Sequence, residues 1–291
     1  MRVPSLKYIG VCLSVLLLVA ALADAQETEA RDIDWSSSFD WETGILELTA
    51  VAPIDRSGPN APAAAHRAEE EIAAQLPSAI VDALTTLRVD SRTTLAGELR
   101  EEPGLYDQLI GLSDQATRRI TRPDRFLGSL EVTYALDLFP GLPRLLLLED
   151  RPLPFPRILG WVPSGSYTGV VIYAAEPLPL HGTDLTTTIE PALFPEIYDE
   201  SMRDLLTREQ LESEFVEQWG VAAYTDSLEL SGFADRIGEN PKRILARRLF
   251  GIAPTDLVIS SRDARELLAS ENNRRLLREG RIVIVTPPPT D

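Results

Sequence analysis

Residues that could do chemistry gather in one stretch of this chain, between positions 181 and 199. The stretch holds one imidazole and four carboxylates, which are His181, Asp184, Glu190, Glu196 and Asp199. Imidazole and carboxylate groups can bind a divalent ion, and histidine is also the usual general base. Their spacing matches no known ligand pattern, and an acidic chain scatters such groups freely. We interpret them as loop residues, and we predict no catalytic, cofactor-binding or metal-binding residue and no cofactor.

Other candidates for chemistry are weaker. His66 lies in an Ala-rich helical segment, where it fits the polar face. Residues 164–166 approach a nucleophile elbow but lack its G-x-S-x-G pattern and a following helix. The paired carboxylates Asp199 with Glu200, and those at 69–71, would serve glycoside hydrolysis only at a defined separation in a cleft. The chain contains neither G-x-x-x-x-G-K-[ST] nor G-x-G-x-x-G, so no phosphate or dinucleotide cradle is expected.

The composition is that of a globular, acidic protein. Of 291 residues, 44% are hydrophobic and 25% are charged, and the net charge is −17. The electrostatic field of this negative charge repels phosphate backbones and anionic lipid surfaces, so we expect no nucleic-acid binding. A basic cluster interrupts the acidic pattern, and we interpret it as a solvated helix face. Its members are Lys242, Arg243, Arg247 and Arg248.

The first 25 residues have the layout of a secretory signal peptide. Arg2 and Lys7 supply a positive start, an apolar run follows, and Ala23 and Ala25 are the small residues of a cleavage site. The apolar run is shorter than the about 20 residues that a membrane-spanning helix needs. We predict cleavage after Ala25 and a periplasmic or otherwise extracytoplasmic location, with no stable membrane span after processing. An uncleaved membrane anchor is the alternative.

The single cysteine supports the same interpretation. Cys12 lies inside the predicted signal peptide, so the mature chain would contain no intrachain disulfide, thiolate nucleophile or cysteine-based metal site. Cys12 could also be a lipid-attachment cysteine, but residues 9–11 make a poor lipobox. A mature protein without disulfides must be stabilised by ordinary burial of apolar surface.

The N-terminal half predicts a helix packed on a sheet. A polar, flexible lead-in is expected over residues 26–40, and an N-terminal α+β domain over 41–139. Alternating apolar residues predict strands at 41–52 and 126–139. A turn precedes a long helix, which Asn60 can cap.

An apolar stripe defines this long helix, because its members recur at three- and four-residue steps. Pro77 interrupts the pattern, so the segment is either one kinked helix or two abutting helices. A second, shorter helix is expected at residues 105–110. The stripe of the long helix consists of Ala65, Ala68, Ile72, Leu76, Ile80, Ala83, Leu84 and Leu87.

A Pro-rich connection at 140–166 separates this domain from a C-terminal α+β domain at 167–286, and residues 287–291 form a tail. The proline density of the connection disfavours regular helix and central strand. In the second domain, strands are predicted at 168–175, 221–225, 257–260 and 281–285, and helices at 241–250 and from Ser261 to Gly280. The fold class is therefore α+β, with two helix-on-sheet subdomains joined by the Pro-rich connection.

Three stretches carry a family resemblance. The Ala-rich helix and the strand at 128–138 resemble the core of small bacterial envelope lipoproteins and the N-terminal module of flagellar outer-ring accessory proteins. Residues 167–174 and 191–200 are similar to a "T-G-L-V-I-D-A … P-A … P-x-I-x-D-E" run of longer relatives, although Tyr173 stands where an acidic residue is common. Residues 255–285 look like their closing helix and strand. The resemblance implies a non-catalytic envelope protein, and it carries no active-site residues.

Together these observations predict an exported, non-enzymatic envelope protein that acts through protein–protein contacts, with envelope or flagellar proteins as partners. The segment 281–285 would offer an edge strand for a partner, unless it is fully paired and buried. Two alternatives stay open. One is an extracytoplasmic hydrolase with a site near His181 to Asp199, and the other is a small-ligand-binding module between the two halves.

Overall fold

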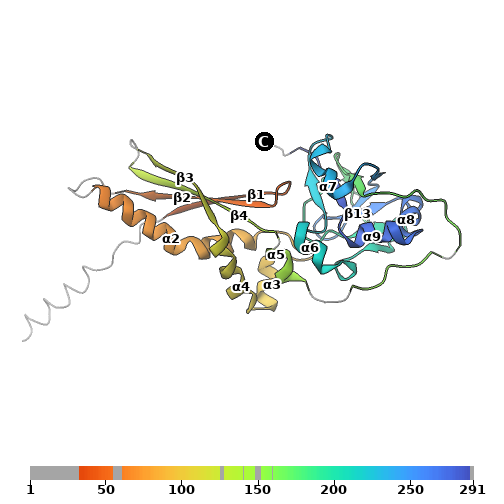
Figure 1. The fold of residues 1–291 in the computed structure, drawn as a ribbon, viewed down its shortest axis with the longest axis horizontal. Helices are drawn as coiled ribbons and strands as arrows, with labels where there is room; N and C mark the ends of the chain where they lie inside the picture. Colours follow the sequence, from red (N-terminus) through yellow and green to blue (C-terminus); the bar gives the residue numbers. More distant parts are fainter. Residues whose placement is uncertain are drawn as a thin grey trace, which may run out of the picture.

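The computed structural model describes residues 33–54, 61–124, 128–139, 141–147, 152–158 and 160–288. It has helices and strands in several sheets, arranged as an N-terminal domain and a C-terminal domain that lie side by side (Figure 1). The predicted α+β class is confirmed. The predicted signal peptide and the Asn60 cap lie outside the described residues.

The N-terminal domain is built on a four-stranded antiparallel sheet in the order β1-β2-β4-β3. Strands alternate their side chains between two faces, and the alternate residues Leu46, Leu48, Ala50 and Ala52 of β2 are all buried. The strands are β1 (Asp34–Asp40), β2 (Ile45–Pro53), β3 (Thr117–Asp124) and β4 (Ser129–Asp137).

Helix α2 (Ala61–Thr85) covers the buried face of this sheet (Figure 1). It continues through Pro77 as one helix, which decides between the two alternatives from the sequence. Its apolar stripe packs first on Ala50 and Ala52 and then on Leu46 and Leu48. The helical elements that follow are α3 (Leu95–Glu101), α4 (Leu105–Leu112), η2 (Ser113–Gln115) and α5 (Gly141–Leu146).

The C-terminal domain contains two further four-stranded sheets. One has the order β10-β14-β5-β11 and is entirely parallel, and the other has the order β12-β13-β8-β9. Parallel strands are buried on both faces, which explains the unbroken apolar runs of β5 and β14. The strands are β5 (Val170–Tyr173), β6 (Leu178–Pro179), β7 (Thr186–Thr187), β8 (Ile197–Asp199), β9 (Asp204–Leu206), β10 (Ala223–Thr225), β11 (Lys242–Leu245), β12 (Arg248–Phe250), β13 (Asp256–Ile259) and β14 (Ile282–Val285).

Short helices complete this domain. Ser260 and Ser270 cap the last two helices, and each side chain accepts a hydrogen bond from the backbone N–H three residues later. The single closing helix expected from the sequence is therefore two helices. The helical elements are η3 (Arg208–Gln210), α6 (Ser213–Trp219), η4 (Ser231–Phe233), α7 (Ala234–Ile237), α8 (Ser261–Leu268) and α9 (Glu271–Arg278).

Two expectations about chain organisation are corrected. Residues 34–40, expected in a flexible lead-in, form β1, because Trp35 and Phe39 pack against the core. The Pro-rich connection begins with α5, in which Leu142 and Leu146 are buried. Beyond α5, its described residues 152–158 and 160–166 form no helix or strand and contact the C-terminal domain, where Phe155 lies under Arg278 and Ser164 donates to the Glu266 carbonyl.

Two expectations about secondary structure are also wrong. Residues 241–250 contain β11 and β12 instead of a helix, so the basic cluster lies on these two strands and, at Arg247, between them. Burial of Ile244 and Leu249 in the core outweighs their weak helical signal. The segment 281–285 is a buried central strand between β10 and β5, so it offers no free edge.

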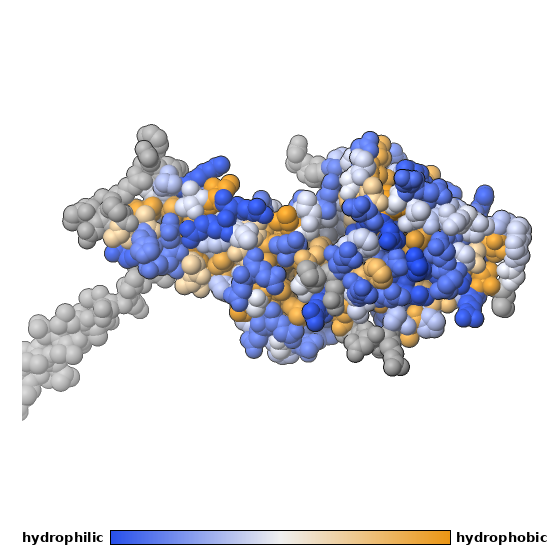
Figure 2. Space-filling model, viewed as in Figure 1, coloured by the Kyte–Doolittle hydropathy of each residue, from blue (hydrophilic) through white to orange (hydrophobic). Residues whose placement is uncertain are grey.

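The hydrophobic core does not stop at the domain boundary. One buried cluster includes Leu46 and Leu84 of the N-terminal domain together with Val170 and Leu257 of the C-terminal domain. Most of the visible face of both domains is hydrophilic (Figure 2). Within the described ranges, no helix is both long enough and apolar enough to cross a lipid bilayer.

Candidate functional site

The turn between β1 and β2 reaches from the N-terminal domain to the C-terminal domain (Figure 1). The Asp40 carboxylate closes this turn by accepting from Glu42 N at 2.8 Å and from Thr43 Oγ1 at 2.7 Å. Burial acts to raise the pKa of Asp40, but the hydrogen bonds from Thr43 and Glu42 outweigh it and lower the pKa. Asp40 therefore keeps its charge at neutral pH.

Trp41 and Glu42 dock this turn onto strand β10. The Trp41 ring meets Phe39 and Tyr224 edge to face, with centroid distances of 4.6 and 5.5 Å. Thr225 Oγ1 donates to Glu42 Oε2 at 2.9 Å. Tyr224 is fully buried and its hydroxyl is bonded to both the N–H and the carbonyl of Ala192, while burial raises its pKa. Trp41 therefore packs against a tyrosine whose position is fixed by its hydrogen bonds to Ala192.

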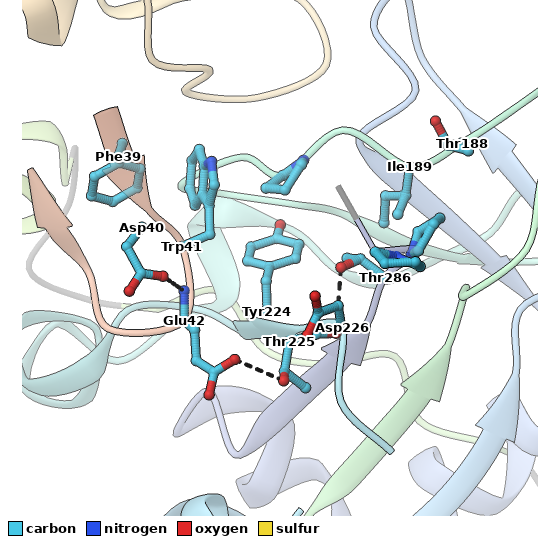
Figure 3. A pocket seen from close by; sticks show the side chains of 13 residues that line it. Phe39, Asp40, Trp41, Glu42, Thr188, Ile189, Tyr224, Thr225, Asp226 and Thr286 are labelled. Atoms are coloured by element: carbon cyan, nitrogen blue, oxygen red, sulfur yellow. Dashed lines mark hydrogen bonds between the residues drawn. The ribbon is translucent and has the colours of Figure 1, made fainter. Parts of the chain in front are cut away.

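A cavity of about 480 Å³ lies beside this contact (Figure 3). It opens at the carboxyl ends of the parallel strands β10 and β14, where ligands commonly bind in open parallel sheets. Its aromatic wall and its carboxylates suit an organic cation, because ring faces and negative charges both attract one. Within the described ranges the lining contains no basic side chain and consists of Phe39, Asp40, Trp41, Glu42, Thr188, Ile189, Pro191, Tyr224, Thr225, Asp226, Thr286, Pro287 and Pro288.

A second contact between the domains is formed by the loop after α2. Leu193 N donates to the Arg88 carbonyl at 3.0 Å, and Phe194 N donates to the Val89 carbonyl at 2.8 Å. The guanidinium of Arg208 stacks over the Phe194 ring at 4.5 Å. Backbone pairing at one place and the docked turn at another hold the two domains in one arrangement.

One buried carboxyl, Asp256, and one half-buried carboxyl, Glu196, lie next to this second contact. Asp256 Oδ1 accepts from Thr255 Oγ1 and from Glu196 N, at 2.9 and 3.2 Å, whereas Oδ2 is buried without a partner of hydrogen-bonding geometry among the described residues. Tyr198 donates its hydroxyl to Glu196. Burial raises the pKa of both Asp256 and Glu196. The negative charge of Asp90 adds to the rise at Asp256, and the negative charge of Asp256 adds to the rise at Glu196.

In the structure, the five residues that the sequence grouped at 181–199 have different surroundings. The Glu190 carboxylate lies 3.5 Å from Arg88 Nε, and the Asp199 carboxylate lies 2.6 Å from Arg203 Nη2. His181 packs edge-on against Phe250, with a buried Nδ1 that lacks a hydrogen-bond partner among the described residues. Asp184 is exposed, and Glu196 accepts from Tyr198 as described above. Across the described residues, no three His, Cys, Asp or Glu side chains form a metal-binding group.

The other candidates also have structural partners. Ser164 Oγ accepts from Asn273 Nδ2 at 2.9 Å and thereby fixes the extended connection on α9. Glu200 accepts from Ser261 N, away from Asp199, which binds Arg203. His66 lies 3.4 Å from Glu70 on the exposed face of α2. Sequence reasoning missed Trp41, Tyr224 and Asp256. The only signals for them were that Trp41 and Tyr224 are aromatic residues within predicted strands and that Asp256 is an acidic residue just before one.

Comparison with known families matches both domains. Residues 32–145 match the family described as Treponema pallidum Tp0624, N-terminal domain. Residues 169–288 match the family described as Treponema pallidum Tp0624, second domain. The two halves are thus similar to two domains of one protein. The intervening residues correspond to most of the Pro-rich connection, and no curated protein matches the chain. Neither family description names an activity, and the lipoprotein and flagellar resemblance stays a prediction.

Proposed function

We propose that this protein is an exported, non-enzymatic component of a bacterial cell envelope that acts through protein–protein contacts. The observation that carries the proposal is the difference between the two edges of the N-terminal sheet. An open strand edge presents backbone N–H and C=O groups to which a partner strand can pair. In the part of the chain that the structure describes, β1 pairs only with β2, and β3 pairs only with β4.

The β3 edge carries the features by which proteins prevent strand pairing. It has Arg118, Arg119, Arg122 and Pro123, and its register shifts between Arg118 and Ile120. Charged residues, proline and an irregular register all block an incoming strand. The β1 edge has no proline and no register shift, and its charged residues, Asp34 and Asp40, stand only at its two ends. It runs in regular register from Asp34 to Asp40, with three consecutive serines at its centre.

A photo-cross-linking residue placed at Ser38 tests this proposal in intact cells. We expect a discrete covalent adduct to an envelope protein, identified by mass spectrometry, in the extracytoplasmic fraction. The same probe at Thr121 of β3 is the matched control and should give no such adduct. Equal labelling from both positions, or none from Ser38, would contradict the proposal. The N-terminus of the recovered protein tests export independently, since processing after Ala25 leaves Gln26 first.

The cavity at the domain contact favours a second candidate, a small-ligand-binding module. Residues from both domains line it, so a bound molecule would stabilise their contact. A ligand that binds only the folded protein raises the melting temperature. A thermal-shift screen of small organic amines tests this candidate, with Trp41→Ala expected to abolish any shift and Trp161→Ala, an exposed position, expected to retain it. The hydrolase alternative stays a prediction. It gains no support from the structure, since Glu190 and Asp199 each pair with a different arginine.

A further inference from the structure

The open edge of β1 is accompanied by a groove between this strand and helix α2. Trp35, Ser37 and Phe39 of β1 face the helix, because their partners on β2 are the buried Ala50, Leu48 and Leu46. Ser37 is the small residue between two aromatic rings, and it leaves space beneath the helix. The resulting groove has a volume of about 320 Å³. Its lining is Trp35, Ser36, Ser37, Leu48, Gln75, Ser78, Ala79, Asp82, Ala83 and Thr86.

The groove lies where a side chain of an added strand would point. In an antiparallel pair, directly opposite residues place their side chains on the same face of the sheet. The residue opposite Ser37 would therefore point toward α2. Leu48, Ala79 and Ala83 provide apolar surface there, and a leucine side chain that enters the groove would lose its contact with water.

The charges around β1 indicate which strand would pair with it. Asp34 and Asp40 stand at its two ends, and among the described residues the groove is lined by Asp82 but by no basic side chain. A second copy of this chain, paired antiparallel about Ser37, would place Asp34 directly opposite Asp40 at both ends. Like charges in directly opposite positions are destabilising, whereas opposite charges are favourable. A basic partner strand is therefore favoured over self-association.

We propose that β1 and α2 bind an extended, basic segment of a partner protein, which adds to the sheet antiparallel to β1 and places an apolar side chain in the groove at Ser37. This inference rests on the proposed function and names the chemistry of the contact. The segment has basic residues opposite Asp34 and Asp40 and one apolar residue midway between them.

A synthetic peptide, Lys-Val-Thr-Leu-Thr-Val-Lys, tests the inference by titration calorimetry on the full chain. We expect binding that weakens as salt rises, since salt screens exposed charges. The Ser37→Leu variant fills the groove from within and should weaken binding about tenfold or more, the size expected for losing one buried leucine. Ser38→Leu, on the opposite face of β1 and not among the residues that line the groove, should change the affinity by less than about twofold. An unchanged affinity in Ser37→Leu would overturn the groove assignment.

A charge exchange tests the pairing partner. Asp34→Lys should weaken the peptide, and a peptide with Glu at its last position should recover binding to that variant, because this residue faces position 34 in the antiparallel register. Asp34 has an exposed side chain, so the substitution should not affect folding. If the Glu peptide binds no better than the Lys peptide, the proposed register is wrong.

Backbone methylation tests strand addition itself. Alternate N–H groups of an added strand point to opposite sides, so N-methylation of one alternate set should abolish binding and of the other set should be tolerated. Equal effects of the two sets would contradict strand addition. Peptide binding without an adduct at Ser38 in cells would leave this inference standing and overturn the proposed function. An adduct at Ser38 without peptide binding would do the reverse.

Discussion

The Trp41 ring meets the Tyr224 ring edge to face, with 5.5 Å between their centroids. Trp41 belongs to the turn between β1 and β2, and Tyr224 belongs to the parallel sheet of the C-terminal domain. This contact ties the strand that carries the open edge to the rest of the molecule. It therefore links the position of β1 to the stability of the domain contact.

Replacing Trp41 with alanine should lower the free energy of unfolding by about 2 kcal/mol, because partial burial of a large ring and an aromatic pair are both lost. Chemical denaturation measures the change. Trp161→Ala removes the same side chain from a site that is 87% exposed and should change stability by less than about 0.5 kcal/mol. Similar losses in both variants would argue against Trp41 as the docking residue.

Gly44 should not tolerate a side chain. Its φ is +73°, and a methyl group there would lie 2.6 Å from Phe139 Cδ2. Gly44→Ala should destabilise the protein by about 1 kcal/mol or more, since both the backbone conformation and the close contact oppose it. Gly111→Ala lies in helix α4 with open space around it and should instead stabilise by up to about 1 kcal/mol. Thermal unfolding of the two variants should shift in opposite directions.

Asp256 should make stability fall as pH rises. Its pKa in the folded protein is raised by burial, so the unfolded chain releases the proton at lower pH. The contribution of Asp256 to stability is therefore complete below the unfolded pKa of about 4, and it is lost as pH rises through the folded pKa. Asp256→Asn should gain stability relative to the wild type as pH rises from about 4 to 8. Urea denaturation of both proteins at each pH measures this difference.

Asp199 provides the control of opposite sign. Burial acts to raise its pKa, but hydrogen bonds from Arg203 and Ser201 outweigh it and lower the pKa. This stabilisation is present above the unfolded pKa and is lost as pH falls through the folded pKa. Asp199→Asn should be destabilised at neutral pH, with the difference from wild type shrinking in acid. Parallel pH profiles for Asp199→Asn and Asp256→Asn would contradict both assignments.

Lys242 should matter more than its neighbours in the basic cluster. Its ammonium lies 2.9 Å from Asp263 and 2.6 Å from Glu266, both on α8, and it joins strand β11 to that helix. Its hydrogen bond is the largest cause of the lowered pKa of Glu266. Lys242→Met should cost about 1 to 2 kcal/mol at neutral pH, because two carboxylates lose a half-buried partner. Arg247→Met, at an exposed position between β11 and β12, should cost less than about 0.5 kcal/mol in the same denaturation assay.

The sequence by itself determined the elements whose periodicity is complete within one segment. The apolar stripe of α2, the alternation of β2 and β4, and the continuous apolar runs of β5 and β14 each record which face is buried, so these elements and the α+β class were predictable. The local pattern suffices because side chains three or four residues apart share a helix face, and those two apart share a strand face.

Only the tertiary structure decided the rest. Residues 242–245 and 248–250 form strands because neighbouring strands supply their hydrogen bonds and bury Ile244 and Leu249, which outweighs local propensity. The same holds for the position of β14 inside its sheet, the different partners of His181 and Asp199, and the groove at Ser37. Each depends on contacts between segments far apart in the chain, and the spacing of residues along the sequence does not encode their distances in space.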